Sequence, residues 1–157
     1  MEKKGVNKEF ITLHVGTPSF LPLWKHDDNE KEDISLEALP GEEFLVYSEK
    51  IKEKIKATRK NGKRVIAVGT TCVRALESMA KRDDLKEEDI FSTSLLISPG
   101  FKFQLVDAMI TNFHQPATSH ILMMQAFMGK RLLKKSYDYA LNNNFRFLSY
   151  GDGMFVF

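Results

Sequence analysis

The chain has 157 residues, 43% of them hydrophobic, and its 23 lysines and arginines nearly balance 21 aspartates and glutamates, for a net charge of +2. This suits one domain with a real core, and it argues against strong non-specific attraction to nucleic acid or acidic membranes, although a local basic patch can hide in the average. With no apolar run of about 18 residues, no leader pattern and a single cysteine, Cys72, we expect a soluble cytoplasmic domain with no membrane contact and no disulfide.

Hydrophobic periodicity and turn residues predict an alternation of strands and helices along the chain. Residues 25–43, which are acidic and contain Pro40-Gly41, indicate an exposed loop. Strands are predicted at 10–16, 43–48, 64–69, 90–97 and 101–113, helices at 49–60, 72–82, 115–129 and 132–144, and a strand, tight turn and strand at 145–157. This order predicts a single α/β domain over 1–157, with a mainly parallel sheet flanked by helices.

Two of these segments carry local signals. Ser48 is a good N-cap for the first helix, which is expected to end at Asn61-Gly62. In FKFQLVDAMITNF (101–113) the apolar positions change phase, which predicts a bulge or sharp bend near Leu105, with Asp107 just beyond it.

The stretch VIAVGTTCVRALES (65–78) is an apolar strand that opens into a helix through a glycine and two threonines. Such a turn leaves the first backbone N–H groups of the helix unpaired, which suits an anion or a polar ligand edge. Thr70 and Thr71 can cap the helix or offer hydroxyls to a ligand, and Arg74 can grip a carboxylate or phosphate. Alternatively the helix is merely capped, and Arg74 pairs with Glu77 along its surface.

Three further segments place polar residues beside strands. His14 stands in an apolar strand that ends at Gly16, where a histidine in the core is the plainer interpretation. VDAMITNFHQP (106–116) places Asp107, Asn112 and His114 on or at the end of one strand, and the carboxyl ends of strands line the ligand crevice of open α/β sheets. Alternatively Asn112 and His114 hold a turn at the strand end, and Asp107 caps a backbone group. Asp152 lies in a Gly-Asp-Gly turn, which is first of all a hairpin. No zinc-ligand spacing, Walker loop or GxGxxG motif is present.

Four segments in this order resemble the C-terminal half of the S-adenosylmethionine:tRNA ribosyltransferase-isomerase family of the queuosine pathway. They are TLHVG (12–16), GKRVIAVGTTCVRALES (62–78), PGFKFQLVDAMITNFHQP (99–116) and FRFLSYGDGMF (145–155). The resemblance implies an enzyme that moves the ribosyl part of S-adenosylmethionine onto 7-aminomethyl-7-deazaguanine at the tRNA wobble position, giving epoxyqueuosine. It also implies the C-terminal portion of a larger α/β domain that lacks the family's inserted β-barrel domain, and hence a fragment inactive by itself.

Carried onto matching positions, the resemblance implies S-adenosylmethionine as ribosyl donor, modified tRNA as partner and no metal. The implied catalytic residues are Asp107, His114 and Asp152, and the implied binding residues are His14, Gly16, Thr70, Thr71, Arg74, Glu77, Asn112 and Tyr150. A histidine near neutral pKa suits removal of the proton next to the sulfonium. An unpaired edge of the truncated sheet would favour self-association.

Some loop residues depart from the family pattern. Pro18 replaces a glycine in HVGTPSF, EDISLEALPGEE (32–43) lacks two histidines, and Ala117-Thr118-Ser119-His120 stands where a Ser-Thr-Leu run is usual. Cys72 occupies a position that is commonly serine, which argues against a thiol nucleophile. The departures keep an alternative open: a diverged domain that binds S-adenosylmethionine, a nucleoside or RNA without the family reaction.

Overall fold

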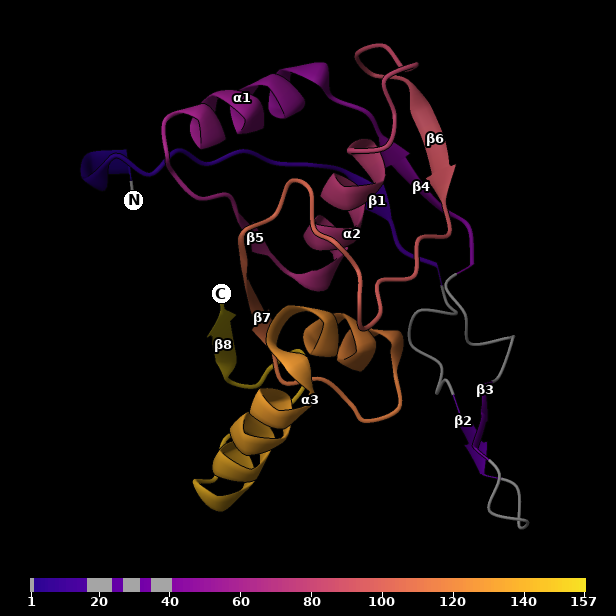
Figure 1. The fold of residues 1–157 in the computed structure, drawn as a ribbon, viewed down its shortest axis with the longest axis vertical. Coiled ribbons are helices and arrows are strands. Elements are labelled where there is room, and N and C mark those ends of the chain that lie inside the picture. Colours follow the sequence, from indigo (N-terminus) through magenta and orange to yellow (C-terminus); the bar gives the residue numbers. More distant parts are fainter. Residues whose placement is uncertain (1, 17–23, 27–31, 35–40) are drawn as a thin grey trace.

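Two three-stranded sheets with α-helices around them form the molecule. The computed structural model describes residues 2–16, 24–26, 32–34 and 41–157 (Figure 1). The first sheet has the order β1-β4-β6 and the second β5-β7-β8, and β2 and β3 form a separate hairpin. The strands are β1 Leu13–His14, β2 Trp24–His26, β3 Glu32–Ile34, β4 Glu43–Val46, β5 Ile66–Val68, β6 Ile90–Thr93, β7 Ala108–Asn112 and β8 Gly153–Val156, and the helices are the 3-10 turn Glu2–Lys4, α1 Glu49–Lys60, α2 Thr70–Met79 and α3 Ser119–Asn142.

The α/β class is confirmed, but the strands are less parallel than expected. Among the described strands, β5 and β7 form a parallel pair, whereas β1–β4, β2–β3, β4–β6 and β7–β8 are antiparallel. The reason is that β6, which follows α2, returns to β4 in the first sheet instead of continuing the sheet of β5. The alternating strands and helices therefore form two sheets instead of one mainly parallel sheet.

The expected acidic loop at 25–43 is only partly described, and the described part differs from a plain loop. It contains residues of the β2–β3 hairpin, with Trp24 opposite Ile34. Its last residue, Glu43, is not exposed: it opens β4 and is 1% accessible. Pro18 and most of 35–43 lie outside the described residues.

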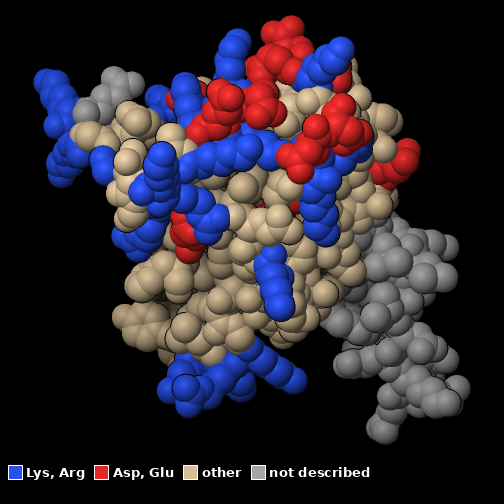
Figure 2. Space-filling model, turned by 45° about the horizontal axis from the view of Figure 1, so that its top comes forward, with Lys and Arg blue, Asp and Glu red and all other residues tan. Residues whose placement is uncertain are grey.

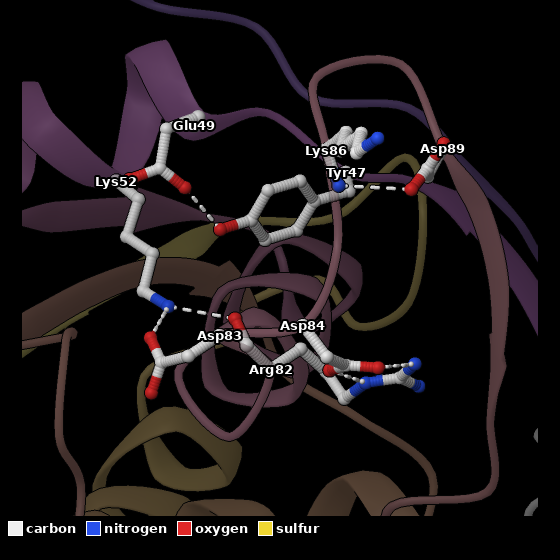
Figure 3. A network of polar contacts seen from close by, with 8 residues as sticks. All are labelled: Tyr47, Glu49, Lys52, Arg82, Asp83, Asp84, Lys86 and Asp89. Carbon is white, nitrogen blue, oxygen red and sulfur yellow. Dashed lines mark hydrogen bonds and ion pairs between the residues drawn. The ribbon is translucent and has the colours of Figure 1, made fainter.

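Helix α1 forms as predicted. The Ser48 side chain accepts a hydrogen bond from the Ile51 N–H, and Asn61 caps the other end. A buried lysine fixes this helix to the loop after α2: Lys52 Nζ donates to Asp83 Oδ1 at 2.6 Å and to the Arg82 carbonyl at 2.7 Å (Figure 3). Lys52 is 4% exposed, so its aliphatic stem packs while its charge meets a carboxylate at the surface.

Helix α2 lies between the two sheets and contacts β1 of the first and β5 and β7 of the second (Figure 1). All residues from Val73 to Met79 are buried, including polar Arg74, Glu77 and Ser78. Burial of charged side chains is uncommon unless they are paired. Their partners therefore decide what this helix does.

Two helices were expected between 115 and 144, and α3 is broken where the sequence places their boundary. Gly129 has φ 75° and ψ 156°, which is not helical, and this region of φ is accessible to glycine at little cost. The helix begins at Ser119 rather than beside Pro116. The second segment, 130–142, leaves the body of the molecule in a new direction (Figure 1).

The chain around 101–107 bends, as the change of apolar phase predicts, but it does not form strand before the bend. Strand β7 starts only at Ala108. The final hairpin is also only half right: β8 pairs with β7 instead of with 145–149. The Leu148 N–H is bonded to the Phe113 carbonyl and the Asp152 N–H to the Arg146 carbonyl, so this stretch satisfies its backbone in turns rather than in a ladder.

One face of the second sheet is apolar and exposed. Val68, Ile110 and Phe155 stand opposite one another across its three strands. They are 65%, 40% and 45% exposed, and Phe157 beyond the end of β8 is 79% exposed. An apolar row of this kind on a sheet is typical of a surface that meets another protein.

Candidate ligand site at the carboxyl ends of β5 and β7

The sharp turn between β5 and α2 is formed as predicted. Gly69 has φ 90° and ψ 150° and is the N-cap of α2, with no side-chain capping bond. Its N–H is bonded to the Ile110 carbonyl of β7 at 2.8 Å, which fixes the turn against the parallel neighbour. Thr70 is the first residue of the helix and is buried, so the threonines do not cap it. Thr71 is half-buried in the first turn.

Arg74 lies one turn into α2 and makes a buried ion pair with Glu43 of β4. Its Nη1 is 2.8 Å from Glu43 Oε2, and the two residues are 3% and 1% exposed. The other carboxylate oxygen accepts a hydrogen bond from the Gly16 N–H at 3.0 Å. Burial lowers the pKa of Arg74 and the nearby Glu43 raises it. Arginine stays charged under such conditions, so this pair joins β4 of the first sheet to α2.

His114 and His120 stack on each other beside this pair. Their ring centroids are 4.9 Å apart at an interplanar angle of 18°. His114 Nε2 is 2.8 Å from the Thr111 hydroxyl, and the backbone on either side of the ring is held by the Tyr137 hydroxyl, which accepts from the His114 N–H and donates to its carbonyl. Both rings are half-buried, so they are the accessible part of the site.

Both imidazoles are neutral at pH 7. Burial lowers the pKa of His114 to about 4, with a contribution from His120, and burial lowers the pKa of His120 to about 4, with a contribution from the Arg74 charge. The field of Arg74 thus reaches His120, which stacks on His114. We call Gly16, Glu43, Arg74, His114 and His120 the histidine–arginine cluster.

Asp107 is not part of this cluster, contrary to the expectation that it lies near His114. It precedes β7, whereas His114 follows it, so the length of a five-residue strand, roughly 16 Å, separates them. Its carboxylate bonds the Val65 N–H at 2.8 Å and pairs with Arg59 at 2.7 Å. Asp107 and His114 therefore lie at opposite ends of strand β7.

The Glu77 carboxylate is bonded to backbone N–H groups and not to Arg74, the partner that the sequence offered. It is 0% exposed, and its carboxylate accepts hydrogen bonds from the N–H groups of Gln104, Leu105 and Val106 at 2.8, 3.0 and 2.9 Å. These donors come from the bend before β7. The buried carboxylate therefore holds the bend to α2.

The predicted residues of the last turn also hold backbone. Asn112 donates to the Gly151 and Asp152 carbonyls at 3.3 and 3.4 Å, and the Asp152 carboxylate accepts from the Arg146 N–H at 2.7 Å. Tyr150 is 97% exposed. The turn interpretation of Gly-Asp-Gly explains these contacts.

His14 and Cys72 differ in their surroundings. His14 is exposed and stands opposite Phe44 on the outer face of the first sheet, so it is not a core histidine, and its side chain is on the face opposite to buried Glu43. Cys72 is half-buried, and burial raises the pKa of its thiol. A raised pKa disfavours the thiolate, in keeping with its predicted lack of a nucleophilic role.

The sequence interpretation missed Glu43 and the role of His120. Glu43 lies at the end of an acidic stretch, where a buried carboxylate is indistinguishable from its exposed neighbours. His120 is six residues after His114, and its position in the first turn of α3 was the one available signal. Thr111 and Tyr137 orient His114.

Other features of the described residues lie elsewhere. An open hollow of about 390 Å³ between the end of α2 and β6 is lined by Ser78, Lys81, Arg82 and residues 91–96, and it contains no member of the cluster. Within the described ranges, no three His, Cys, Asp or Glu side chains gather as metal ligands. Nor does any helix of that part combine the length and hydrophobicity needed to cross a bilayer.

The two neutral histidines are expected to make stability fall in acid. Their pKa of about 4 in the folded state is below the ordinary 6.5, so the unfolded chain binds more protons between these values and folding weakens as pH drops from 6.5 to 4. A His114→Gln/His120→Gln variant should lose about 2 kcal/mol less over this window than the wild type, measured by urea unfolding. His14→Gln is the matched control, and equal pH slopes in all three proteins would refute the neutral pair.

The chain is similar over nearly its full length to proteins of one family. The family model described as Queuosine biosynthesis protein matches residues 1–156. The chain is 40% identical over 156 residues to the S-adenosylmethionine:tRNA ribosyltransferase-isomerase of Thermoanaerobacter sp. (strain X514), covering 99% of this chain and 44% of that protein. It is 42% identical over 161 residues to the protein of the same name from Francisella philomiragia subsp. philomiragia, covering 100% and 44%.

A solved structure agrees with these similarities. The crystal structure of S-adenosylmethionine tRNA ribosyltransferase from Thermotoga maritima superposes with a TM-score of 0.65 and 39% identity, covering 72% of this chain and 40% of that one. The chain thus spans less than half the length of the relatives it matches. The resemblance indicated by the sequence motifs is thus confirmed. Since the family model covers almost every residue and the relatives are about 40% identical across them, the chain belongs to the queuosine biosynthesis protein family, which is a family of enzymes.

Proposed function

We propose that this chain supplies the histidine–arginine cluster to an enzyme that transfers the ribosyl part of S-adenosylmethionine to 7-aminomethyl-7-deazaguanine in tRNA, giving epoxyqueuosine. The names of the relatives support the reaction class. The observation that carries the site is the stacked pair of neutral histidines beside a buried Arg74–Glu43 pair, at the shared carboxyl edge of β5 and β7. Because the chain spans 44% of its relatives, other residues of a complete protein would finish the site.

The charges of the cluster suit a sulfonium ligand. Glu43 offsets the charge of Arg74, and both rings are neutral at pH 7, so a cationic sulfur next to them meets no net positive charge. This changes the role expected for Arg74. Its guanidinium is already bonded to a carboxylate of the protein, so we assign it to positioning His120 and Glu43 instead of to gripping the carboxylate of methionine.

His114 is the proposed base for the proton next to the sulfonium. Its Nε2 lies 2.8 Å from the Thr111 hydroxyl, which can donate to it or accept from it according to the tautomer. The stacked His120 ring limits the orientation of the imidazole, and Tyr137 holds the His114 backbone. A neutral imidazole is able to accept a proton, but a pKa lowered to about 4 makes His114 a weaker base than the near-neutral histidine expected from the sequence.

The proposed reaction is tested by adenine release. A complete protein containing this chain should release adenine from S-adenosylmethionine only when tRNA carrying 7-aminomethyl-7-deazaguanine is present. His114→Ala should lower kcat by about 100-fold or more, with His14→Ala as the matched control. Release of adenine at the wild-type rate by the His114 variant would end the assignment of the base.

A binding role without the reaction is the second candidate, and the loop departures from the family pattern, at Pro18 and in 32–43, favour it. In that case S-adenosylmethionine, a nucleoside or RNA would bind, but the complete protein would release no adenine with a verified substrate. Either role places the protein in the cytoplasm, where tRNA is modified.

We also propose that the isolated chain self-associates through the exposed apolar face of β5, β7 and β8. Uncovered apolar rows associate in water. Sedimentation should show a molecular mass that rises with concentration, and Val68→Lys/Ile110→Lys should return the chain to a monomer. Phe10→Lys, at an apolar residue 78% exposed outside this face, should not. A clean monomer at every concentration contradicts this expectation.

A further inference from the structure

A group of exposed basic side chains stands at the start of the second segment of α3. Lys130, Arg131, Lys134 and Lys135 are all exposed, whereas Leu133 between them is buried. Lys130 and Lys134 are four positions apart, as are Arg131 and Lys135, so each pair is adjacent on the helix surface. All four side chains point away from the core. Figure 2 shows a group of basic side chains at the lowest part of the face that it draws. We call these four residues the α3 basic patch.

Two of these charges stand at an unfavourable position of their own helix. Because Gly129 is not helical, Lys130 and Arg131 occupy the first turn of a new segment, where the backbone dipole disfavours cations. Lys134 pairs with Asp138 at 2.8 Å. For Lys130, Arg131 and Lys135 no ion pair is found with any other described residue. The patch therefore keeps an excess of positive charge that the fold does not use.

Helix α1 is also rich in lysine, and three of its six basic side chains have acidic partners. Lys52 and Lys54 pair with Asp83 and Glu9, and Arg59 pairs with Asp107. Glu49 is in its first turn and Arg59 and Lys60 are in its last, as the helix dipole favours. A run of lysines is usually just a solvated face, and α1 fits that description, whereas the α3 basic patch does not.

The patch is connected rigidly to the histidine–arginine cluster. Tyr137 stands one turn after Lys134 on the same helical segment, and its hydroxyl is bonded to the His114 N–H and carbonyl at 2.8 and 3.2 Å. An anionic polymer lying on the patch would therefore lie within a short reach of the proposed base. The basic end of α1 lies by Asp107, at the other end of β7.

We propose that the α3 basic patch binds the phosphate backbone of the RNA substrate and thereby holds the target nucleotide near His114. The inference rests on the proposed function. Arg131 can bond a phosphate in a bidentate manner, and Lys130 and Lys135 act as point charges beside it. Contacts of this kind position RNA without reading its sequence. Because the whole chain is nearly neutral, RNA should be attracted mainly to this local patch and not to the rest of the surface.

The test compares two variants with the same change of charge. Lys130→Gln/Arg131→Gln/Lys135→Gln removes the patch, and Lys56→Gln/Lys60→Gln/Lys63→Gln removes three exposed cations at α1 and the turn after it. Fluorescence anisotropy with a tRNA anticodon stem-loop should show about tenfold weaker binding for the patch variant, and a slope of log affinity against log salt that is smaller by about 2 to 3. The α1 variant should bind within about twofold of the wild type.

Several outcomes would overturn the inference. They are equal losses in the two variants, no RNA binding by the wild-type chain, and a patch that binds phosphatidylserine vesicles more tightly than RNA. Because the patch residues are exposed, the unfolding temperature of the patch variant should not fall, and a fall would mean that folding explains the loss. S-adenosylmethionine binding, followed separately at His114 and His120, tests the proposed function. If the patch variant loses RNA binding but still binds S-adenosylmethionine, the patch proposal is supported. If the wild-type chain binds RNA through the patch but does not bind S-adenosylmethionine, only the proposed function is contradicted.

Discussion

Replacing Glu77 by alanine should destabilise the protein by about 4 kcal/mol, because three buried or partly buried backbone N–H groups would lose a charged acceptor at once. The carboxylate is 0% exposed and accepts from Gln104, Leu105 and Val106. No other described side chain is bonded to these three N–H groups, so the bend before β7 would be left without partners. Chemical denaturation monitored by circular dichroism measures the loss.

Two further variants separate this cause from loss of helical packing. Glu77→Gln keeps one carbonyl oxygen but turns an amide towards the donors, so it should also destabilise, though by less than alanine. Glu53→Ala, at an exposed position of α1, should leave the free energy of unfolding unchanged. A loss below about 1 kcal/mol for Glu77→Ala would mean that water replaces the carboxylate and that the bend does not depend on it.

Removing Arg74 alone should cost about 4 kcal/mol, because the Glu43 carboxylate would remain buried and lose its counter-ion. The pair is 2.8 Å long and almost completely buried. The double variant Arg74→Met/Glu43→Met should be less destabilised than Arg74→Met, since it buries no unpaired charge. Urea unfolding of the four proteins of this cycle gives the coupling between the two side chains.

The exposed pair of Arg82 with Asp84 is the control for that cycle. Arg82→Met should produce no measurable loss, because solvent screens the remaining carboxylate. If Arg74→Met and Arg82→Met had equal effects, or if the double variant were the least stable protein, the buried pair would not hold β4 to α2.

Local rules were enough to predict most elements of this fold. Ser48 caps α1 as a serine before an amphipathic run should, and the glycine at 129 separates two helical segments where the pattern divides. What local rules could not supply is the assignment of strands to sheets. Strand β6 is apolar and follows a helix, and only its tertiary contact with β4 makes it antiparallel.

The site was predictable where a residue follows a strand directly and not where its partner is distant in sequence. Gly69 and His114 lie at the shared end of β5 and β7 as expected. The sequence predicts Asp107 beside them because the expected strand, 101–113, contains Asp107. The observed strand begins only after it, at Ala108. Glu43, 31 positions from Arg74, could be found only once the first sheet lay against α2.

The central claim is that the histidine–arginine cluster contacts S-adenosylmethionine, and NMR of the imidazole nitrogens tests it most directly. Titration of the chain at pH 7 should move the ring signals of His114 and His120 in a saturable manner, while those of exposed His14 stay in place. A calorimetrically confirmed complex that leaves both signals unmoved, or shifts at His14 alone, would contradict the account.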